Sequence, residues 1–564
     1  MKSPNGPTGM EVALPISPRK NVTDSPPIST GSTRREFIVG ASMALASTTF
    51  LGQNSGPSLA ADRHRPRYHL MPPSAWLNDP NGPLHWKGQY HLFYQYSPVI
   101  SNFGPKYWGH AVSRDLVHWK NLGIALAPTP GGPDKNGCWS GSAVIANGVP
   151  TLVYTGATWS AENEFSERAK GLIPERQLVA VAVDPSDVNL KKWSKISENP
   201  VLTAPPPEMK AVGWRDPSLW KEGDTWYMVI GSGEIGQGGM ALLYRSRDLR
   251  KWTYLHPLAV AKPDPNTQDA TRPWNAMWEC PEFFFLQGEP VLLLARGNGY
   301  LTGTYADHRF QQTREGQIDY GTAAYAQKTM EDVNGRRIWW AWIREKRSDQ
   351  AQKVAGWAGV MSLPRLLTLR SDGSLGVEPV PELKVLRRKP RRIGNRKISP
   401  NGPLLLEHGE SDCVEIEVEI ELGGSRQVGV RVRSTADGSE QTLIGYDRNS
   451  REVFCDTTRS SKDSETDGRP PFLPGRAAER GALSLGEAEP LRLRIYIDAS
   501  VIEVFANGRA SLSDRVYPVD PASLGIGLFA KGGTARVRSM TVWELSPISD
   551  DRLTSGSELF DTHG

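Results

Sequence analysis

Five short runs of aromatic and branched apolar residues, each entered through a glycine, recur between residues 86 and 340. A run of this kind, too short for a helix and preceded by turn residues, is typical of a buried strand that follows a hairpin turn. The turn glycines are 60, 75, 65 and 47 residues apart, and each interval is long enough for a four-stranded sheet. The runs are WKGQYHLFY, ANGVPTLVY, EGDTWYMV, QGEPVLLL and NGRRIWW, with turn glycines Gly88, Gly148, Gly223, Gly288 and Gly335.

A second repeat supports the same organisation. The heptapeptide SRDLVHW at residues 113–119 returns as SRDLRKW at residues 246–252, at a similar distance after its hairpin. Five sheet units without helical periodicity between them predict an all-β fold, a five-bladed β-propeller whose innermost strands surround a central channel. The alternative is an ordinary β-sandwich whose hairpins resemble one another by coincidence.

The pattern changes after residue 381. Residues 384–397, KVLRRKPRRIGNRK, hold eight basic residues, and we expect a solvated linker there, with a polyanion-binding patch as the alternative. Beyond it, VEIEVEI at residues 414–420 and LRLRIYI at residues 491–497 alternate strictly between apolar and charged or polar positions. Such alternation is typical of strands with one solvated face, so it predicts a C-terminal β-sandwich.

The domain boundaries follow from these changes of pattern, because a chain of 564 residues exceeds what one hydrophobic core usually covers. We expect an N-terminal segment at residues 1–61, the propeller at 62–382, the basic linker at 383–397, the β-sandwich at 398–546 and a C-terminal tail at 547–564.

The composition limits the chemistry. Sixty-six Lys and Arg against 62 Asp and Glu give a net charge of +4, which is too small for a dedicated nucleic-acid binder of this size. The four cysteines contain no CxxC pair, and the ten histidines contain no HExxH spacing. We therefore expect no nucleic-acid partner, no disulfide framework, no catalytic metal and no other cofactor.

The N-terminal segment predicts export. STRREFI at residues 32–38, with Arg34 and Arg35, precedes the weakly apolar run VGASMALA, which is typical of a twin-arginine signal with the mature chain beginning near Ala61. The run is too short and too rich in small polar residues for a membrane span, so we expect a periplasmic or extracellular protein. Residues 1–31, rich in Pro, Ser and Thr, are expected to be disordered. The alternative for the whole segment is a disordered tail with a chance arginine pair.

Three carboxylates occupy a similar place in the repeat. Asp79, Asp216 and Glu279 lie nine, seven and nine residues before the turn glycines of their hairpins, and a tryptophan lies within three residues of each acid. In a propeller this spacing places them near the same end of the innermost strands, around the mouth of the channel. Sugar rings stack on aromatic faces and their hydroxyls need carboxylate partners, so the pattern indicates a carbohydrate site.

Each acid taken alone also has a structural interpretation. Asp79 and Asp216 both precede proline, as turn residues often do, and Glu279 could be a surface charge. Their shared place in the repeat favours the functional interpretation. Two carboxylates across a glycosidic bond can divide the roles of nucleophile and proton donor, and a third can hold hydroxyls.

The sequence around these acids resembles glycoside hydrolase family 32, the family of invertases, levanases and inulinases. The resemblance covers about residues 66–546 and rests on ordered blocks. The blocks are WLNDPNG at 76–82, FYQY at 93–96, WGHA at 108–111, WSGS at 139–142, WRDP at 214–217, WECP at 278–281, DYG at 319–321, WAGVMSLPR at 357–365 and IDASVIEVF at 497–505.

The resemblance implies a five-bladed propeller joined to a β-sandwich and a retaining hydrolysis of terminal β-fructofuranosyl units. It makes Asp79 the nucleophile, Glu279 the general acid and base, and Asp216 the stabiliser of the transition state. A retaining pair of carboxyl groups lies roughly 5 to 5.5 Å apart. The substrate-binding residues implied by position are Asn78, Gln95, Trp108, Trp139, Ser140, Arg215 and Trp342.

Several positions qualify this assignment. Packing remains the alternative for Gln95 and Trp108, and Cys280 is expected to be a packed thiol beside Glu279. Trp139 stands where the family often has Phe, and the charged stretch at residues 159–175 is longer than the usual loop. Both differences would change the substrate entrance.

The main hypothesis is an exported exo-acting β-fructosidase that cleaves fructose from levan, inulin or sucrose. A fructosyltransferase with the same residues is the nearest rival, because a sugar would then replace water as the acceptor. A fructan-binding propeller without catalysis is a rival from another class.

Overall fold

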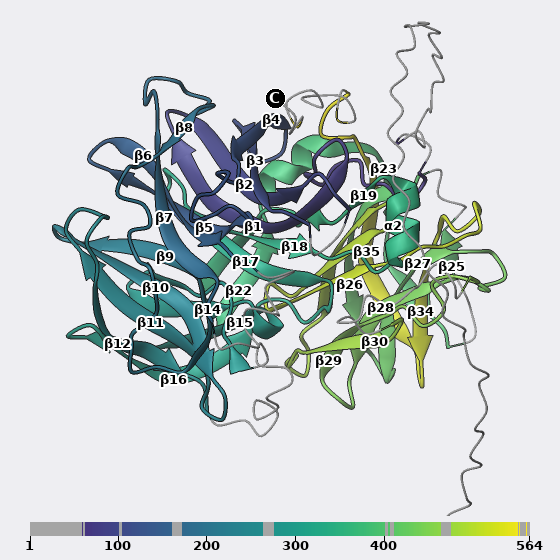
Figure 1. The fold of residues 1–564 in the computed structure, drawn as a ribbon. Helices are drawn as coiled ribbons and strands as arrows, with labels where there is room; N and C mark the ends of the chain where they lie inside the picture. Colours follow the sequence, from purple (N-terminus) through teal and green to yellow (C-terminus); the bar gives the residue numbers. More distant parts are fainter. Residues whose placement is uncertain are drawn as a thin grey trace, which may run out of the picture. The chain divides into compact units, whose positions relative to one another are not determined.

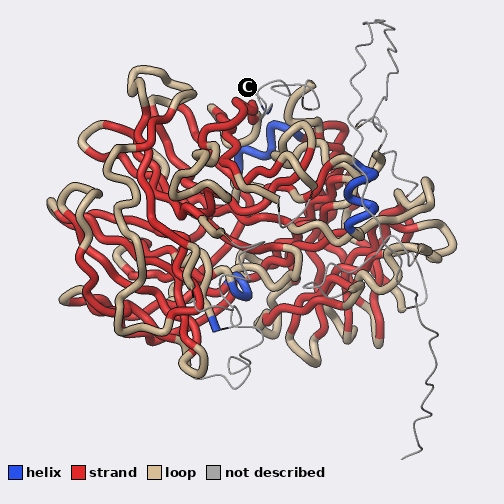
Figure 2. The backbone as a smooth tube through the Cα atoms, in the orientation of Figure 1, coloured by secondary structure: helices blue, strands red, loops and turns tan. Residues whose placement is uncertain are grey.

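Antiparallel strands dominate the chain (Figure 2). A computed structural model of the protein describes Leu59, residues 62–100, 104–160, 172–262, 276–400, 404–406, 411–463 and 475–550, Arg552 and Phe560. The twin-arginine segment and most of the 159–175 stretch lie outside the described residues. In the part of the chain that is described, no helix has the length and apolar character needed to cross a membrane.

Five antiparallel sheets of successive strands fill the chain from Ala75 to Pro379 (Figure 1). The first two are β1 (Ala75–Trp86), β2 (Gln89–Ser97), β3 (Tyr107–Ser113), β4 (Trp119–Leu126), then β5 (Gly137–Ala146), β6 (Val149–Ala157), β7 (Glu175–Ala182), β8 (Trp193–Lys195). The next two are β9 (Ala211–Glu222), β10 (Thr225–Glu234), β11 (Gly238–Ser246), β12 (Thr253–Val260), then β13 (Glu282–Leu286), β14 (Glu289–Leu294), β15 (Gly299–Ala306), β16 (Arg309–Gln317). The fifth is β17 (Ala324–Glu331), β18 (Arg337–Ile343), β21 (Arg365–Leu369), β22 (Leu375–Pro379).

The five sheets form a closed ring, which the first strand of each sheet or, in the fourth, its second strand completes. Strand β1 contacts β5, β5 contacts β9, β9 contacts β13, β14 contacts β17, and β17 contacts β1. Hydrogen bonds also join the last part of the ring to the first, because β19 (Trp357–Ala358) pairs in parallel with the start of β1 while β20 (Val360–Met361) pairs with β18. This arrangement is a propeller, in agreement with the prediction.

The predicted hairpin turns are present in every sheet. All five turn glycines adopt a positive φ, between 55° and 90°, a conformation that side chains with a Cβ adopt only at a cost. The second repeat is structural as well. Leu116 and Leu249 both have a positive φ, and the indoles of Trp119 and Trp252 donate to their carbonyls at 2.9 and 3.1 Å.

Only a few short helices interrupt the strands in the described part of the chain. Helix α2 (Asp349–Ala355) begins at Ser348, whose side chain accepts a hydrogen bond from Ala351 N, and ends at Gly356 with φ 75°. The 3₁₀ segments η3 (Arg296–Asn298) and η4 (Pro381–Leu386) connect strands.

Two further sheets form the C-terminal half. One has the order β23 (Arg387–Ile393), β35 (Ala535–Leu545), β26 (Cys413–Glu421), β31 (Leu491–Asp498), β32 (Val501–Ala506), β33 (Ala510–Arg515), with β24 (Arg396–Ile398) also on β35. The other has the order β25 (Leu404–Leu406), β34 (Gly525–Lys531), β27 (Gln427–Ser434), β28 (Thr442–Asp447), β29 (Glu452–Asp456), β30 (Ala478–Ala482).

The alternating pattern places one face of these sheets in a common core. The alternate residues of β26 are buried, and they pack with apolar residues of both sheets. The acidic residues between them pair across the outer face, with Glu417 opposite Arg494 and Glu419 opposite Arg492. The predicted β-sandwich is therefore confirmed.

The basic stretch is not a linker, so that prediction is wrong. Residues 387–398 form β23 and β24, which pair with β35 at the edge of a sheet. Arg387 donates to Glu415 at 2.7 Å, and its guanidinium lies 3.8 Å from the ring centroid of Trp543. An edge strand tolerates many charges because its backbone pairs on one side while its side chains stay solvated.

The expected tail also departs from its prediction. Ile548 and Phe560 are buried, and the Phe560 ring lies 4.7 Å from that of Tyr96. Ile548 N donates to Arg67 O at 3.0 Å. These two residues beyond position 546 thus pack against the folded chain.

Buried charges join the propeller sheets to the sandwich. Arg365, fully buried, donates to Asp319 Oδ2 at 2.6 Å and to Glu503 Oε2 at 2.7 Å. His69 lies between Glu503 and Asp498, at 3.1 and 2.8 Å. Burial by itself would lower the pKa of His69, but the hydrogen bonds that its ring donates to the two carboxylates raise it.

We expect Arg365→Ala to lower the free energy of unfolding by about 3 to 5 kcal/mol, because it leaves two buried carboxylates without their cation. Chemical denaturation measures this change. Arg538→Ala removes an arginine of the sandwich surface that contacts Glu419 and Glu421, and it should leave the stability nearly unchanged. Equal stability of Arg365→Ala and the wild type would contradict the expectation.

Candidate active site

The same β-bulge occurs on the innermost strand of every propeller sheet. In β1, Leu77 pairs with Tyr96 and Pro80 with Tyr94, so two residues of β1 lie opposite Gln95 alone. In three other sheets the same shift of register leaves two residues of the innermost strand opposite one residue of its partner. Ahead of β13, the pair Glu282–Leu293 and the bond that Ala295 N donates to Glu279 O at 3.1 Å leave two residues opposite one in the same way. The bulged pairs are Asn78 and Asp79, Trp139 and Ser140, Asp216 and Pro217, Cys280 and Pro281, and Ala326 and Gln327.

A bulge changes the direction of the side chains around it. In a regular strand, neighbouring side chains point to opposite faces, so only every second residue could reach the channel. At these bulges, consecutive residues such as Asn78 and Asp79, or Arg215 and Asp216, contribute to the same network. The bulges of β1 and β9 therefore bring neighbouring side chains of one strand into a common polar network.

The three acids occupy three successive places around this bulge. Glu279 immediately precedes its bulge, Asp216 is the first bulged residue of β9, and Asp79 is the second bulged residue of β1. The sequence count put them at one equivalent position, and the structure corrects this. They still lie close together, because Arg215 contacts Asp216 and Glu279 while the Cys280 thiol contacts Asp79 and Asp216.

Asp79 is held by neutral donors. Asn78 Nδ2 donates to its Oδ1 at 3.1 Å, and Ser140 Oγ donates to its Oδ2 at 2.6 Å. Gln95 joins the two donors, since it accepts from Asn78 at 2.6 Å and donates to Ser140 at 2.7 Å. The indole of Trp76 donates to Asn78 Oδ1 at 2.9 Å. Burial raises the pKa of Asp79, and the Ser140 and Asn78 hydrogen bonds oppose that rise.

Both the backbone and the side chain of Asp216 are held by hydrogen bonds. Its φ is 66°, its backbone N donates to Thr155 Oγ1 at 2.9 Å, and its Oδ2 accepts from Cys280 N at 2.9 Å. Burial raises the pKa of Asp216 to about 6, with Arg215 opposing the shift and Glu279 adding to it.

The thiol of Cys280 lies between two of the acids. Its Sγ is 3.8 Å from Asp79 Oδ2 and 3.6 Å from Asp216 Oδ2. Burial raises the pKa of this thiol well above its ordinary value, and both carboxylates add to the rise. Cys280 is therefore a neutral donor to Asp79 and Asp216, whereas the sequence had placed it beside Glu279 alone. All four cysteines are free and buried.

Glu279 has 32% of its side chain accessible, against 5% for Asp216. Arg215 Nη2 donates to its Oε1 at 2.6 Å, and the Tyr325 hydroxyl donates to its Oε2. Arg215 also donates to the buried Glu175 at 3.0 Å, and its guanidinium lies 5.7 Å from the Trp139 ring centroid. Burial would lower the pKa of Arg215, but Glu279 and Glu175 raise it well above its ordinary value.

The predicted tryptophans have different places. Trp139 is partly exposed beside Arg215. Trp342 lies 5.8 Å from Trp76, ring to ring, and its buried indole N–H has no hydrogen-bond partner among the described residues. Trp108 has no exposed surface and donates to Trp139 O at 3.0 Å, so it supports the wall of the site from behind rather than lining it.

Sequence reasoning gave no role in the site to Glu175, Tyr325 or Lys106, although Tyr325 and Ala326 follow the DYG block in the family's order. Glu175 ends the charged 159–175 stretch and had no local signal. Tyr325 follows the DYG block closely, so that block was the available signal. Lys106 lies 5.3 Å from the Trp76 ring centroid and lowers the pKa of Asp79.

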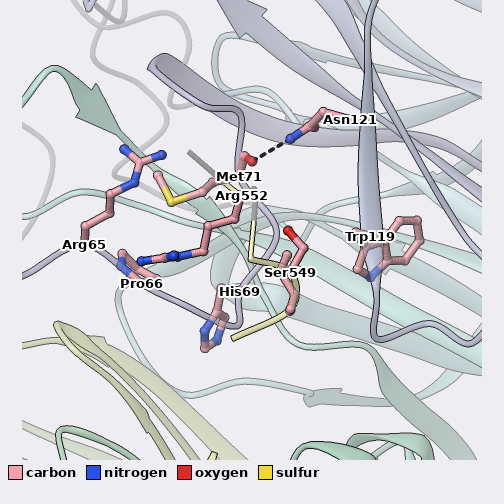
Figure 3. Close-up of a pocket in the computed structure, with 9 residues that line it drawn as sticks. Arg65, Pro66, His69, Met71, Trp119, Asn121, Ser549 and Arg552 are labelled. Carbon is pink, nitrogen blue, oxygen red and sulfur yellow. Dashed lines mark hydrogen bonds between the residues drawn. The ribbon is translucent and has the colours of Figure 1, made fainter. Parts of the chain in front are cut away.

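A small enclosed cavity elsewhere contains none of these acids (Figure 3). Among its lining residues, Asn121 Nδ2 donates to Met71 O at 3.0 Å. The cavity is lined by Arg65, Pro66, His69, Met71, Trp119, Asn121, Ile548, Ser549 and Arg552.

Two carboxylates beside a guanidinium, a third held by neutral donors, and a partly exposed tryptophan, on a propeller joined to a sandwich, fit a glycoside hydrolase. The chain belongs to glycosyl hydrolase family 32. The model of that family's N-terminal domain matches residues 69–379, and the model of its C-terminal domain matches residues 382–544.

Relatives cover most of the chain. A sucrose-6-phosphate hydrolase of Zymomonas mobilis is 34% identical over 517 residues, which are 87% of this chain and 94% of the relative. A levanase of Bacillus subtilis is 31% identical over 89% of this chain and 74% of its own length. The crystal structure of fructan 1-exohydrolase IIa from Cichorium intybus superimposes with a TM-score of 0.75 at 28% identity, over 86% of this chain and 98% of that one.

We expect Asp216→Asn to stabilise the protein at pH 8. The folded state binds the Asp216 proton more tightly than the unfolded state, so the contribution of this carboxyl is favourable below pH about 4 and is lost as the pH rises through about 6. Removing the charge should raise the unfolding free energy by about 2 to 3 kcal/mol at pH 8, and the gain should shrink toward pH 4.

Denaturation of both proteins at pH 4 and pH 8 measures this difference. Asp115→Asn is the control, because hydrogen bonds from His118 lower the pKa of Asp115 against the effect of its burial, so its pH trend is opposite. A gain for Asp216→Asn that is the same at both pH values would contradict the assignment.

Proposed function

We propose that the protein is a retaining, exo-acting β-fructosidase that hydrolyses terminal β-D-fructofuranosyl units of fructans or sucrose. The observation that carries this proposal is that two carboxylates of one site have different hydrogen-bond partners. Asp79 is partly exposed and held by the neutral donors Asn78 and Ser140, while Glu279, also partly exposed, is held by Arg215 and Tyr325. Unequal environments allow one carboxyl to act as nucleophile and the other as acid and base.

In the proposed mechanism, Asp79 attacks the anomeric carbon of the fructosyl unit. Glu279 gives its proton to the departing glycosidic oxygen, so that bond breaks while the fructosyl–Asp79 ester forms. Glu279 then takes a proton from water, and the resulting hydroxyl displaces Asp79. Two displacements at one carbon retain its configuration.

Asp216 and its neighbours serve binding in this proposal. The Asp216 carboxylate accepts fructose hydroxyls and stabilises the positive charge of the transition state, close to Arg215. Burial raises the pKa values of Asp79 and Asp216, and the charge of Glu279 adds to both rises. Asn78, Gln95 and Ser140 hold both the nucleophile and the sugar.

The names of the relatives support this substrate class. They include levanase and beta-fructofuranosidase, and one solved structure is fructan 1-exohydrolase in complex with 1-kestose. Sucrose 6-phosphate is the second candidate substrate, since three of the most similar curated relatives are named sucrose-6-phosphate hydrolase. Fructosyl transfer and binding without catalysis remain the rival functions for the same site.

We expect the purified protein to release fructose from at least one of sucrose, sucrose 6-phosphate, inulin and levan. Asp79→Ala and Glu279→Ala should each lower kcat by at least about a thousandfold on that substrate. Reaction in the presence of methanol should give methyl β-D-fructofuranoside, identified by ¹³C NMR, because a retaining enzyme transfers with the configuration preserved.

Other products would point to other conclusions. The α-configured methyl fructoside would exclude the retaining mechanism, and release of fructose by Asp79→Ala at the wild-type rate would exclude its role as nucleophile. Oligosaccharides that dominate over free fructose at high sucrose would favour a fructosyltransferase. A protein that binds fructan yet releases nothing from all four substrates would be a lectin.

We also propose export to the periplasm or the outside of the cell, on the strength of the twin arginine at residues 34 and 35. Cell fractionation should find the active protein outside the cytoplasm, with an N-terminus near Ala61. Replacing both arginines with lysine should retain it inside. Export of the double-lysine form at the normal rate would contradict the proposal.

A further inference from the structure

A chain of contacts runs from the sandwich to the proposed acid and base. Glu479 in β30 accepts hydrogen bonds from Thr322 N at 2.9 Å and from the Thr322 hydroxyl. The carbonyl of Thr322 accepts from the Arg344 guanidinium, which lies 4.8 Å from the ring centroid of Tyr325. The Tyr325 hydroxyl then donates to Glu279 Oε2.

The sandwich also holds the backbone from which Tyr325 projects. Strand β33 runs parallel to the segment that enters β17, with Asp319 bridged to Ser511, Tyr320 N bonded to Ser511 O at 2.8 Å, and Ala323 N bonded to Ser513 O at 3.3 Å. A Cβ on Gly321 would lie 2.1 Å from Ser513 O, so the two backbones touch. The segment that leads to Tyr325 is thus held by a sheet outside the propeller, while Tyr325 itself pairs with Trp342 of β18.

The charged groups along this path interact electrostatically. Glu479 is 7% exposed and also accepts from Lys346 at 3.1 Å. Burial lowers the pKa of Arg344, while Tyr325, Glu479 and Glu279 raise it. Arg344 is therefore coupled to a carboxylate of the sandwich at one end and to the acid and base of the propeller at the other.

We propose that the β-sandwich positions the proton donor of the active site. Glu479 and β33 fix Thr322 and Arg344, these fix Tyr325, and Tyr325 orients the Glu279 carboxyl toward the departing oxygen. Tyr325, Arg344 and Glu479 are positioning residues, since they act through Glu279. The inference rests on the proposed role of Glu279 and gives the sandwich a part in the reaction.

The first test is Tyr325→Phe, which removes one hydroxyl and keeps the ring that faces Arg344. We expect kcat/KM on the natural substrate to fall about tenfold, with KM within about twofold of the wild type. The alkaline limb of the pH profile should move to higher pH, because the Glu279 carboxylate loses a donor that stabilises its charge. A purely structural change would lower activity without moving that limb.

A substrate with an activated leaving group sharpens the test. With 4-nitrophenyl β-D-fructofuranoside the leaving group needs little protonation, so kcat/KM of Tyr325→Phe should return to within about twofold of the wild type. An equal loss on both substrates would mean that Tyr325 does not act through proton donation.

The second test examines the sandwich. Glu479→Gln keeps the size of the side chain and should lower kcat/KM about threefold, with the same recovery on the activated substrate. The double variant Tyr325→Phe/Glu479→Gln should be no slower than Tyr325→Phe alone, because both changes affect one path. Glu440→Gln is the matched control, since Glu440 is a buried sandwich carboxylate bonded to Ser523 and remote from this path.

The outcomes separate this inference from the proposed function. Glu279→Gln that hydrolyses the natural substrate normally would overturn the role of Glu279 and the inference with it. If Glu279→Gln loses activity, two results would overturn the inference alone. One is that the effects of Tyr325→Phe and Glu479→Gln are additive, and the other is that Glu479→Gln and Glu440→Gln have equal effects. Non-additive effects, a shifted alkaline limb and recovery on the activated substrate would support it.

Discussion

The arrangement of the active site depends on one buried guanidinium. Asp79, Asp216 and Glu279 repel one another inside a ring of strands, and burial raises the cost of each charge. Arg215 offsets this cost by bonding to Glu279 and Glu175 and by lying 3.9 Å from Asp216. A lysine would not replace it, because only the planar fork of a guanidinium reaches several carboxylates at fixed angles.

At the junction between the propeller and the sandwich, a buried guanidinium again lies between carboxylates. Arg365 lies between Asp319 and Glu503, and Asp319 belongs to the segment that leads to Tyr325 only six residues later. One short stretch of backbone thus connects the Arg365 ion pairs, which join the domains, to the site that would perform the chemistry. A rigid connection of this kind suits a reaction that depends on the placement of a carboxyl group to within a fraction of an ångström.

Much of the fold could be predicted because its signals are local. Each hairpin turn needs a positive φ, so the five turn glycines mark the five sheets directly in the sequence. The basic stretch misled the analysis because its partner strand β35 lies some 150 residues further along the chain. Charge composition describes exposure of side chains, and it says nothing about which backbone pairs with which.

The sequence by itself determined the fold class and predicted the three acids, since each acid stands beside proline or tryptophan in a short block that can be recognised locally. It also determined Asn78, Ser140 and Arg215 as their neighbours. Only the tertiary structure decided that the acids take three different places around a bulge, that Trp108 lies behind the wall, and that Tyr325 and Glu175 complete the network. The physical reason is that a bulge arises from the pairing of two strands. A shift of that pairing by one residue changes which side chains face the site, and the pairing depends on the partner strand as well as on the local sequence.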